Sequence, residues 1–82
     1  MHEIGVAISI LEAVKEEAEL HQPGRPVKVG IRIGEMAGVD RDALAFAFEV
    51  VIKESGMEPL QLNVETGVGD ELVFSYLEMD EP

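Results

Sequence analysis

The stretch Pro26-Val27-Lys28-Val29-Gly30-Ile31-Arg32-Ile33 decides the fold of this chain. Apolar side chains alternate along it with charged residues or glycine, so that one face of an extended strand carries Val27, Val29, Ile31 and Ile33. This alternation is typical of a strand with one buried face and one solvated face. The remaining segments must therefore supply the layer that covers the apolar face.

Two amphipathic helices flank this strand in the sequence. Residues 3–20 have helical apolar spacing, and His21-Gln22-Pro23-Gly24 ends the helix. Asp40 is a good N-cap for a second helix over residues 41–54, which closes at Ser55-Gly56. The predicted inner positions are Ile4, Ala7, Ile8, Leu11, Val14 and Ala18 in the first helix and Leu44, Ala47, Phe48 and Val51 in the second, with Phe46 and Val50 as a second buried edge.

Two further strands are predicted over residues 60–65 and 72–79. The glycines of Thr66-Gly67-Val68-Gly69-Asp70 indicate a hairpin connection between them. The order α-β-α-β-β predicts an α+β domain in which two helices pack on one face of a three-stranded, mainly antiparallel sheet. A right-handed crossover would make the first two strands parallel. We favour the third strand in the middle, which pairs every neighbour antiparallel, and an order of one, two, three is the alternative.

The composition indicates a single small acidic domain. The 82 residues are 46% hydrophobic and 28% charged, as in a globular chain. Seventeen acidic and six basic residues give a net charge of −11, which disfavours nucleic acid and anionic membranes and favours cations or a basic partner. The absence of cysteine excludes disulfides and a thiolate zinc site. With neither a signal peptide nor a membrane-spanning run in the sequence, we expect a cytoplasmic protein.

No catalytic constellation is evident. Without cysteine, and with His2 and His21 far apart in the sequence, no nucleophile is matched to a base. Residues 34–38 contain glycines but lack the lysine and hydroxyl that end a phosphate-binding loop. We therefore expect a binding protein rather than an enzyme.

The candidate metal site is the amino terminus, Met1-His2-Glu3. The α-amine, the His2 amide nitrogen and the His2 imidazole Nδ1 can close two fused chelate rings in one plane, which suits Ni(II) or Cu(II). The first N–H groups of a helix have no intrahelical partner, so an amide ligand there costs no helical hydrogen bond. The alternative is that His2 is a frayed terminal residue. His21 is expected to complement the helix C-terminus, with a bridging role between chains as the alternative.

Several motifs resemble a known family. They are the opening Met1-His2-Glu3, a helix bearing Leu11-Glu12 and Glu16-Glu17-Ala18, residues 29–39 (VGIRIGEMAGV), residues 43–50 (ALAFAFEV) and residues 69–79 (GDELVFSYLEM). In this order they are similar to the HypA/HybF family of nickel metallochaperones, which act in hydrogenase maturation. The resemblance spans nearly the whole chain.

The resemblance implies a nickel site and a set of partners. It implies that His2, with the terminal amine of Met1 and nearby amides, binds Ni(II) for delivery to the large subunit of nickel–iron hydrogenase, together with a maturation GTPase. In some organisms such proteins also serve urease and its accessory proteins. Glu3 matches the family residue associated with partner binding and with tuning of the metal site, so the implied metal-site residues are Met1, His2 and Glu3.

One departure from the family is large. The family carries a zinc domain with two Cys-x-x-Cys pairs between its last two strands, where this chain has only residues 66–70. We therefore expect residues 1–82 to form a single nickel-binding domain without zinc; an excised domain and a natural short homologue both fit. The alternative function is a metal-free interaction or oligomerisation module. A residual apolar surface and a tightly turning connection would permit a homodimer that exchanges third strands, and a monomer is the alternative.

Overall fold

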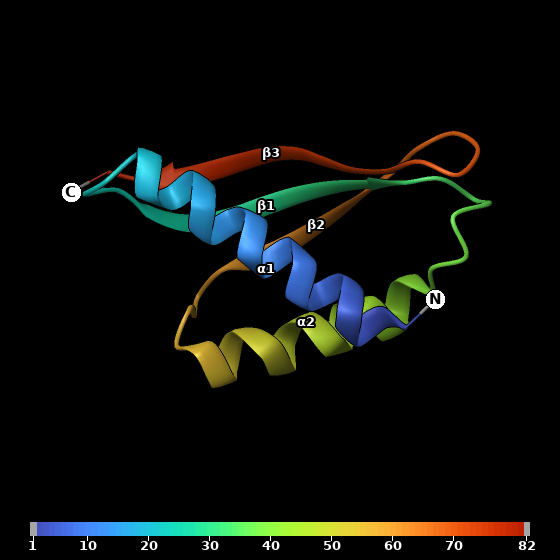
Figure 1. Ribbon diagram of the computed structural model, residues 1–82, viewed down its shortest axis with the longest axis horizontal. Helices are drawn as coiled ribbons and strands as arrows, with labels where there is room; N and C mark the ends of the chain where they lie inside the picture. The colour runs from blue at the N-terminus through green and yellow to red at the C-terminus, as the bar shows by residue number, and fades with distance from the viewer. Residues whose placement is uncertain (1, 82) are drawn as a thin grey trace.

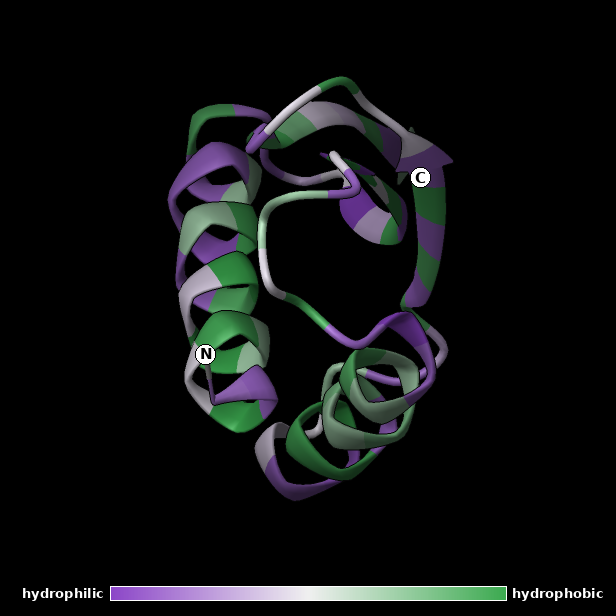
Figure 2. Ribbon diagram, turned by 90° about the vertical axis from the view of Figure 1, so that its right-hand side faces the viewer, coloured by the Kyte–Doolittle hydropathy of each residue, from purple (hydrophilic) through white to green (hydrophobic). Residues whose placement is uncertain are grey.

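The computed structural model describes residues 2–81 as two helices and three strands in the predicted order (Figure 1). Both helices lie on one face of the sheet, and Figure 2 shows apolar residues on the sides of the helices that face the interior. The predicted α+β class is confirmed. The elements are α1 (Glu3–Leu20), β1 (Arg25–Ile33), α2 (Arg41–Ser55), β2 (Gln61–Thr66) and β3 (Leu72–Asp80).

The strand order differs from the favoured prediction, because β1 and not β3 is central. The order is β2-β1-β3, with β1 parallel to β2 and antiparallel to β3. Eight residue pairs join β1 to β3 and six join it to β2, so the sheet is mixed but mostly antiparallel. Val29, Ile31 and Ile33 of β1 are at most 2% exposed, whereas no residue of β2 or β3 is fully buried. The strand with the strongest apolar alternation thus takes the position that is flanked on both sides.

The segment between β2 and β3 is a crossing connection, so the hairpin prediction is wrong. It passes over the end of β1 and joins the two edge strands (Figure 1). The Gly67 N–H donates to the Ile33 carbonyl at 2.9 Å, and the Gly34 N–H donates to the Glu71 carbonyl at 2.8 Å. A β-carbon on Gly34 would lie 2.1 Å from the Gly69 carbonyl oxygen. Gly34 is therefore required for close backbone approach. The connection still turns tightly at residues 68–71, where the Glu71 N–H donates to the Val68 carbonyl at 3.2 Å, so the strand-exchanged dimer stays a prediction.

Helix α2 begins and ends where the sequence predicts. The Asp40 carboxylate accepts from the backbone N–H groups of Asp42 and Ala43 at 3.0 and 3.1 Å. Gly56 ends the helix in the left-handed conformation, with φ of 69°. Phe46, however, is 69% exposed, so the prediction that α2 is buried along a second edge is wrong at this residue.

Helix α1 buries a different arc from the one predicted. Ile4 and Ile8 are 53% and 46% exposed, whereas Val6 and Ile10 are buried. The helix is apolar over a wide arc, so periodicity alone does not decide which part of that arc meets the sheet and α2. The buried residues of α1 are Val6, Ala7, Ile10, Leu11 and Val14. Within residues 2–81, neither helix has the length and hydropathy needed to cross a membrane.

The sheet face that points away from the helices is organised around Gly30. Gly30 lies opposite Tyr76 on one side and Asn63 on the other. The Asn63 Nδ2 donates to the Tyr76 hydroxyl at 2.7 Å, so the tyrosine reaches across β1. A β-carbon on Gly30 would lie 2.1 Å from Cε2 of the Tyr76 ring. Glycine at this position therefore makes room for the ring.

We expect Gly30→Ala to destabilise the domain by about 1–3 kcal/mol, because the tyrosine ring must move and its bond to Asn63 is lost. Urea denaturation of the variant measures this cost. In a Tyr76→Ala background the same change should be neutral or stabilising, because alanine is favoured over glycine in a strand by roughly 0.5–1 kcal/mol when space is available. Equal costs in the two backgrounds would contradict the proposed contact.

Candidate functional site

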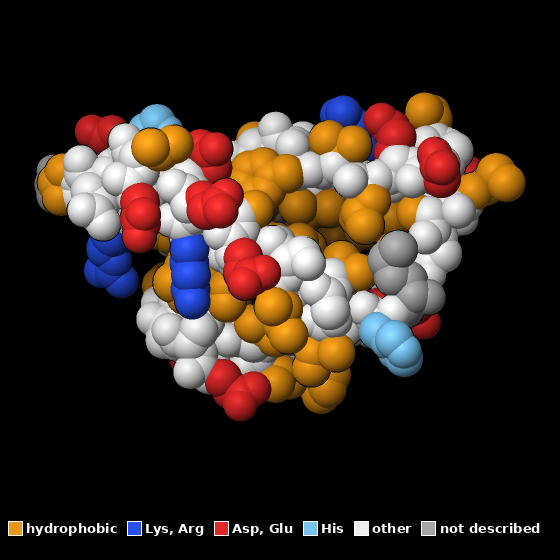
Figure 3. All heavy atoms as spheres, viewed as in Figure 1, with side chains coloured by type: hydrophobic (Ala, Val, Ile, Leu, Met, Phe, Trp, Pro, Cys, Tyr) orange, Lys and Arg blue, Asp and Glu red, His pale blue; other side chains and the backbone are white. Residues whose placement is uncertain are grey.

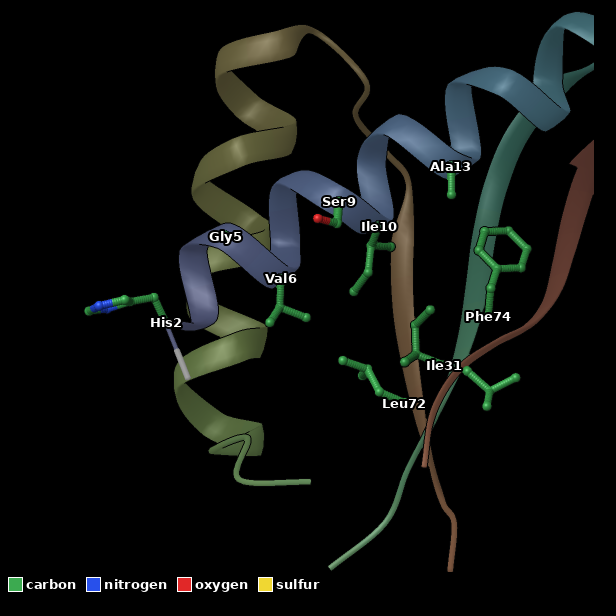
Figure 4. A pocket seen from close by; sticks show the side chains of 10 residues that line it. His2, Gly5, Val6, Ser9, Ile10, Ala13, Ile31, Leu72 and Phe74 are labelled. Atoms are coloured by element: carbon green, nitrogen blue, oxygen red, sulfur yellow. The ribbon is translucent and has the colours of Figure 1, made fainter. Parts of the chain in front are cut away.

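His2 lies at the exposed start of α1. It is the N-cap residue, with φ of −82° and ψ of 114°, and its carbonyl accepts the Val6 N–H at 3.2 Å. Its side chain makes no capping hydrogen bond. Figure 4 shows the imidazole pointing outward, away from the body of α1. The ring nitrogens are therefore accessible to a ligand from solvent.

The backbone next to His2 offers amide nitrogens as well as the imidazole. Because the Val6 N–H is the donor to the His2 carbonyl, the amides before Val6 precede the helical hydrogen-bond ladder. Such an amide can be deprotonated for a metal without breaking a helical bond. Among residues 2–81 there is no group of three or more histidine, aspartate or glutamate side chains arranged to hold a metal ion. The predicted ligand Met1 lies outside the described residues.

Glu3 joins the start of α1 to the start of α2. Its Oε2 accepts a hydrogen bond from the Asp40 backbone N–H at 2.9 Å, and Asp40 itself caps α2. This bond is the main cause that lowers the pKa of the Glu3 carboxyl, and the backbone N–H of Glu3 adds to the effect. The sequence indicates only the capping role of Asp40. No local signal reveals a contact across 37 residues, because it depends on how the two helices are placed.

His21 is at the other end of α1 and takes no part in this site. Its backbone N–H donates to the Ala18 carbonyl at 3.1 Å, which closes the helix. Its Nε2 is 3.9 Å from Oε2 of Glu17, one helical turn earlier. The fold therefore keeps the two histidines apart, as the sequence predicts for a helix of this length.

This chain is similar to known proteins that share one family. Residues 1–70 match the family described as "Hydrogenase/urease nickel incorporation, metallochaperone, hypA". The "Hydrogenase maturation factor HypA" of Psychromonas ingrahamii is 37% identical over 65 residues, covering 79% of this chain and 57% of that protein. The protein of the same name from Xanthobacter autotrophicus is 36% identical over 78 residues, covering 95% and 69%.

A solved structure agrees with these matches. The solution structure of the Ni metallochaperone HypA from Helicobacter pylori aligns with a TM-score of 0.73 at 26% identity, covering 82% of this chain and 58% of that one. The fold and the matches define a class of metal carriers rather than enzymes. The chain belongs to the HypA family. It spans 57% of the length of the Psychromonas relative.

We expect the Glu3 carboxyl to titrate below the ordinary glutamate pKa of about 4.3, as followed by ¹³C NMR of that carboxyl. Since the pKa is lower in the folded state, the Asp40–Glu3 bond stabilises the domain above the unfolded-state pKa. This contribution is lost as the pH falls through the folded-state pKa. Glu3→Gln should therefore lower the thermal midpoint at neutral pH and match the wild type in strong acid. A difference that is independent of pH would contradict the assignment.

Proposed function

We propose that this domain binds Ni(II) at its amino terminus and carries it to a hydrogenase. The observation that carries the proposal is His2, which has an exposed imidazole without a capping bond at the first turn of α1. Membership of a nickel-incorporation family supports the choice of metal. The nickel ion is the cargo of this site, and residues 1–82 would act as one nickel-binding domain.

The proposed ligands are three nitrogens: the amine of Met1, the amide of His2 and its imidazole Nδ1. Nickel(II) with nitrogen ligands in one plane adopts a square-planar arrangement. Because the amide and imidazole protons must leave, the affinity should rise with pH. The Irving–Williams order favours Cu(II) over Ni(II) at such a site, so selectivity in the cell must come from metal supply and from partners.

Glu3 is proposed to orient this site and to contact a partner. Its carboxylate is already engaged by the Asp40 N–H, so it would have to leave that bond to become a ligand. A carboxylate held in this way ties the first residue of α1 to the start of α2. We therefore assign Glu3 a positioning role next to the metal ligands, in addition to the partner contact that the family resemblance implies.

The proposed partners are the hydrogenase large subunit and a maturation GTPase. The relatives named as hydrogenase maturation factors support the first of these. The family description also names urease, so urease accessory proteins are included. The cytoplasmic location, the absence of zinc and the homodimer stay predictions from the sequence. A metal-free interaction module remains the second candidate, because an apolar groove lies beside His2.

His2→Ala should abolish tight nickel binding. The test is calorimetric titration of untagged protein whose native amino terminus is verified by mass, because extra residues before Met1 would remove the amine ligand. Wild-type protein should bind one nickel, and the complex should be diamagnetic with an affinity that increases with pH. His21→Ala is the matched control and should bind like the wild type. Unchanged stoichiometry and affinity in His2→Ala would exclude the site.

Glu3→Gln should reduce nickel affinity by about tenfold or less, because it alters a group that supports the ligands. The Asp40 amide resonance shows whether Glu3 becomes a nickel ligand. If Glu3 keeps its hydrogen bond to Asp40, this resonance should stay near its metal-free position when nickel is added. Nickel transfer to a partner should be more impaired than binding. An affinity loss as large as that of His2→Ala would make Glu3 a ligand instead.

A further inference from the structure

An apolar groove runs between α1 and β3, and we call it the α1–β3 groove. Its volume is about 490 Å³. Figure 4 shows side chains from the helix and from the sheet facing one another across it. It is lined by His2, Gly5, Val6, Ser9, Ile10 and Ala13 of α1 and its cap, and by Ile31, Leu72, Val73 and Phe74 of the sheet.

The groove borders an open edge of the sheet. Strand β3 is at the end of the order β2-β1-β3, so within residues 2–81 its outer side pairs with no strand. Leu72 and Val73, at the start of β3, are 39% and 37% exposed. An extended segment can add to such an edge by main-chain hydrogen bonds and place alternate side chains on one face. On the helix side, these side chains would enter the groove.

Acidic residues border the apolar lining. Glu12 and Glu16 follow Gly5 by seven and eleven residues, which places them on the same face of α1 as the groove-lining Gly5 and Ser9. Both glutamates are exposed. Figure 3 shows acidic side chains toward both ends of the hollow, where apolar atoms are visible inside it. Arg32 is paired with Glu71 at 3.5 Å and does not neutralise the charge of Glu12 and Glu16.

We propose that the α1–β3 groove binds an extended segment of a partner protein whose apolar side chains on one face are followed, along that same face, by basic side chains. The apolar side chains fill the groove, the basic ones meet Glu12 and Glu16, and the backbone adds to the edge at the start of β3. The net charge of −11 also favours a basic occupant, because opposite charges attract. Docking there would bring the partner to the end of α1 that carries His2, but it does not require bound metal.

A second copy of this chain is a poor occupant. Each copy carries the same net charge of −11. Glu71 precedes β3, Glu78 and Asp80 lie within it, and two β3 edges brought together would place acidic residues close to acidic residues. Charged residues on an edge strand are a common means of preventing self-pairing. Charge thus favours a basic partner segment over a second copy of this chain at this surface.

The test is NMR titration of metal-free protein with a blocked octapeptide in which serine occupies every second position and the positions between carry two valines followed by two lysines. We expect shifts of the Val6, Ile10 and Leu72 methyls and of the amides at the start of β3. A peptide of the same composition whose lysines and valines lie on opposite faces of the strand, and one with glutamate in place of lysine, should bind more weakly by roughly tenfold or more.

Two variants locate the binding. Glu12→Lys/Glu16→Lys should weaken it by about fivefold or more, whereas the control Glu54→Lys/Glu58→Lys, with the same change in charge on α2 and the loop after it, should not. Ala13→Phe should occupy the groove and abolish the methyl shifts while the amide spectrum confirms folding. The proposal would be overturned if all three peptides bound equally or if the two charge variants had equal effects. It would also be overturned if the NMR shifts lay outside the groove, or if the protein had twice its monomer mass without peptide. Nickel binding by His2 would be unaffected by any of these results.

Discussion

The burial of one face of β1 is the constraint on which the rest of this domain depends. Val29, Ile31 and Ile33 are almost completely excluded from solvent, because β2 and β3 flank the strand and the helical layer covers it. With at most 2% of each side chain exposed, these residues recover most of the ~1.5–3 kcal/mol that a branched aliphatic side chain gains on full burial. An 82-residue chain has few other sources of stability. The opposite face of β1 is then left to polar contacts, which Tyr76 and Asn63 make across Gly30.

Local signals in the sequence predict the helices and strands well, but they do not predict how these elements are arranged relative to one another. Asp40 and Gly56 bound α2 as expected, because caps act within a few residues of themselves. The place of β1 in the sheet is mispredicted, since the glycines at 67 and 69 also fit a hairpin connection. Gly67 allows close approach at the end of β1, where a β-carbon would lie 3.2 Å from the Gly34 nitrogen, and Gly69 adopts the left-handed conformation with φ of 57°. A hairpin turn uses glycine for the same reasons. The exposure of Ile4 and Ile8 has a similar origin, in that a wide apolar arc does not specify its own orientation.

The candidate site shows the same division between local and long-range information. His2 can be identified from the sequence because the covalent structure of the chain fixes its distance from the terminal amine. The hydrogen bond between Glu3 and the Asp40 amide cannot be identified in this way, because it forms only when α1 and α2 start at the same end of the domain. Two helix N-termini meet there, and each favours nearby negative charge. The acidic Glu3 is thus stabilised beside His2 by the fold itself.

The crossing connection between β2 and β3 also has a geometric consequence. It lies at the end of the sheet where α1 begins, as Figure 1 shows, and its backbone is held against β1 by the Gly67 and Gly34 hydrogen bonds. Additional residues inserted between β2 and β3 would leave the domain from this end and could extend past the first turn of α1. In longer relatives, a length change at this one connection would alter what stands beside the terminal histidine while leaving both helices and all three strands in register.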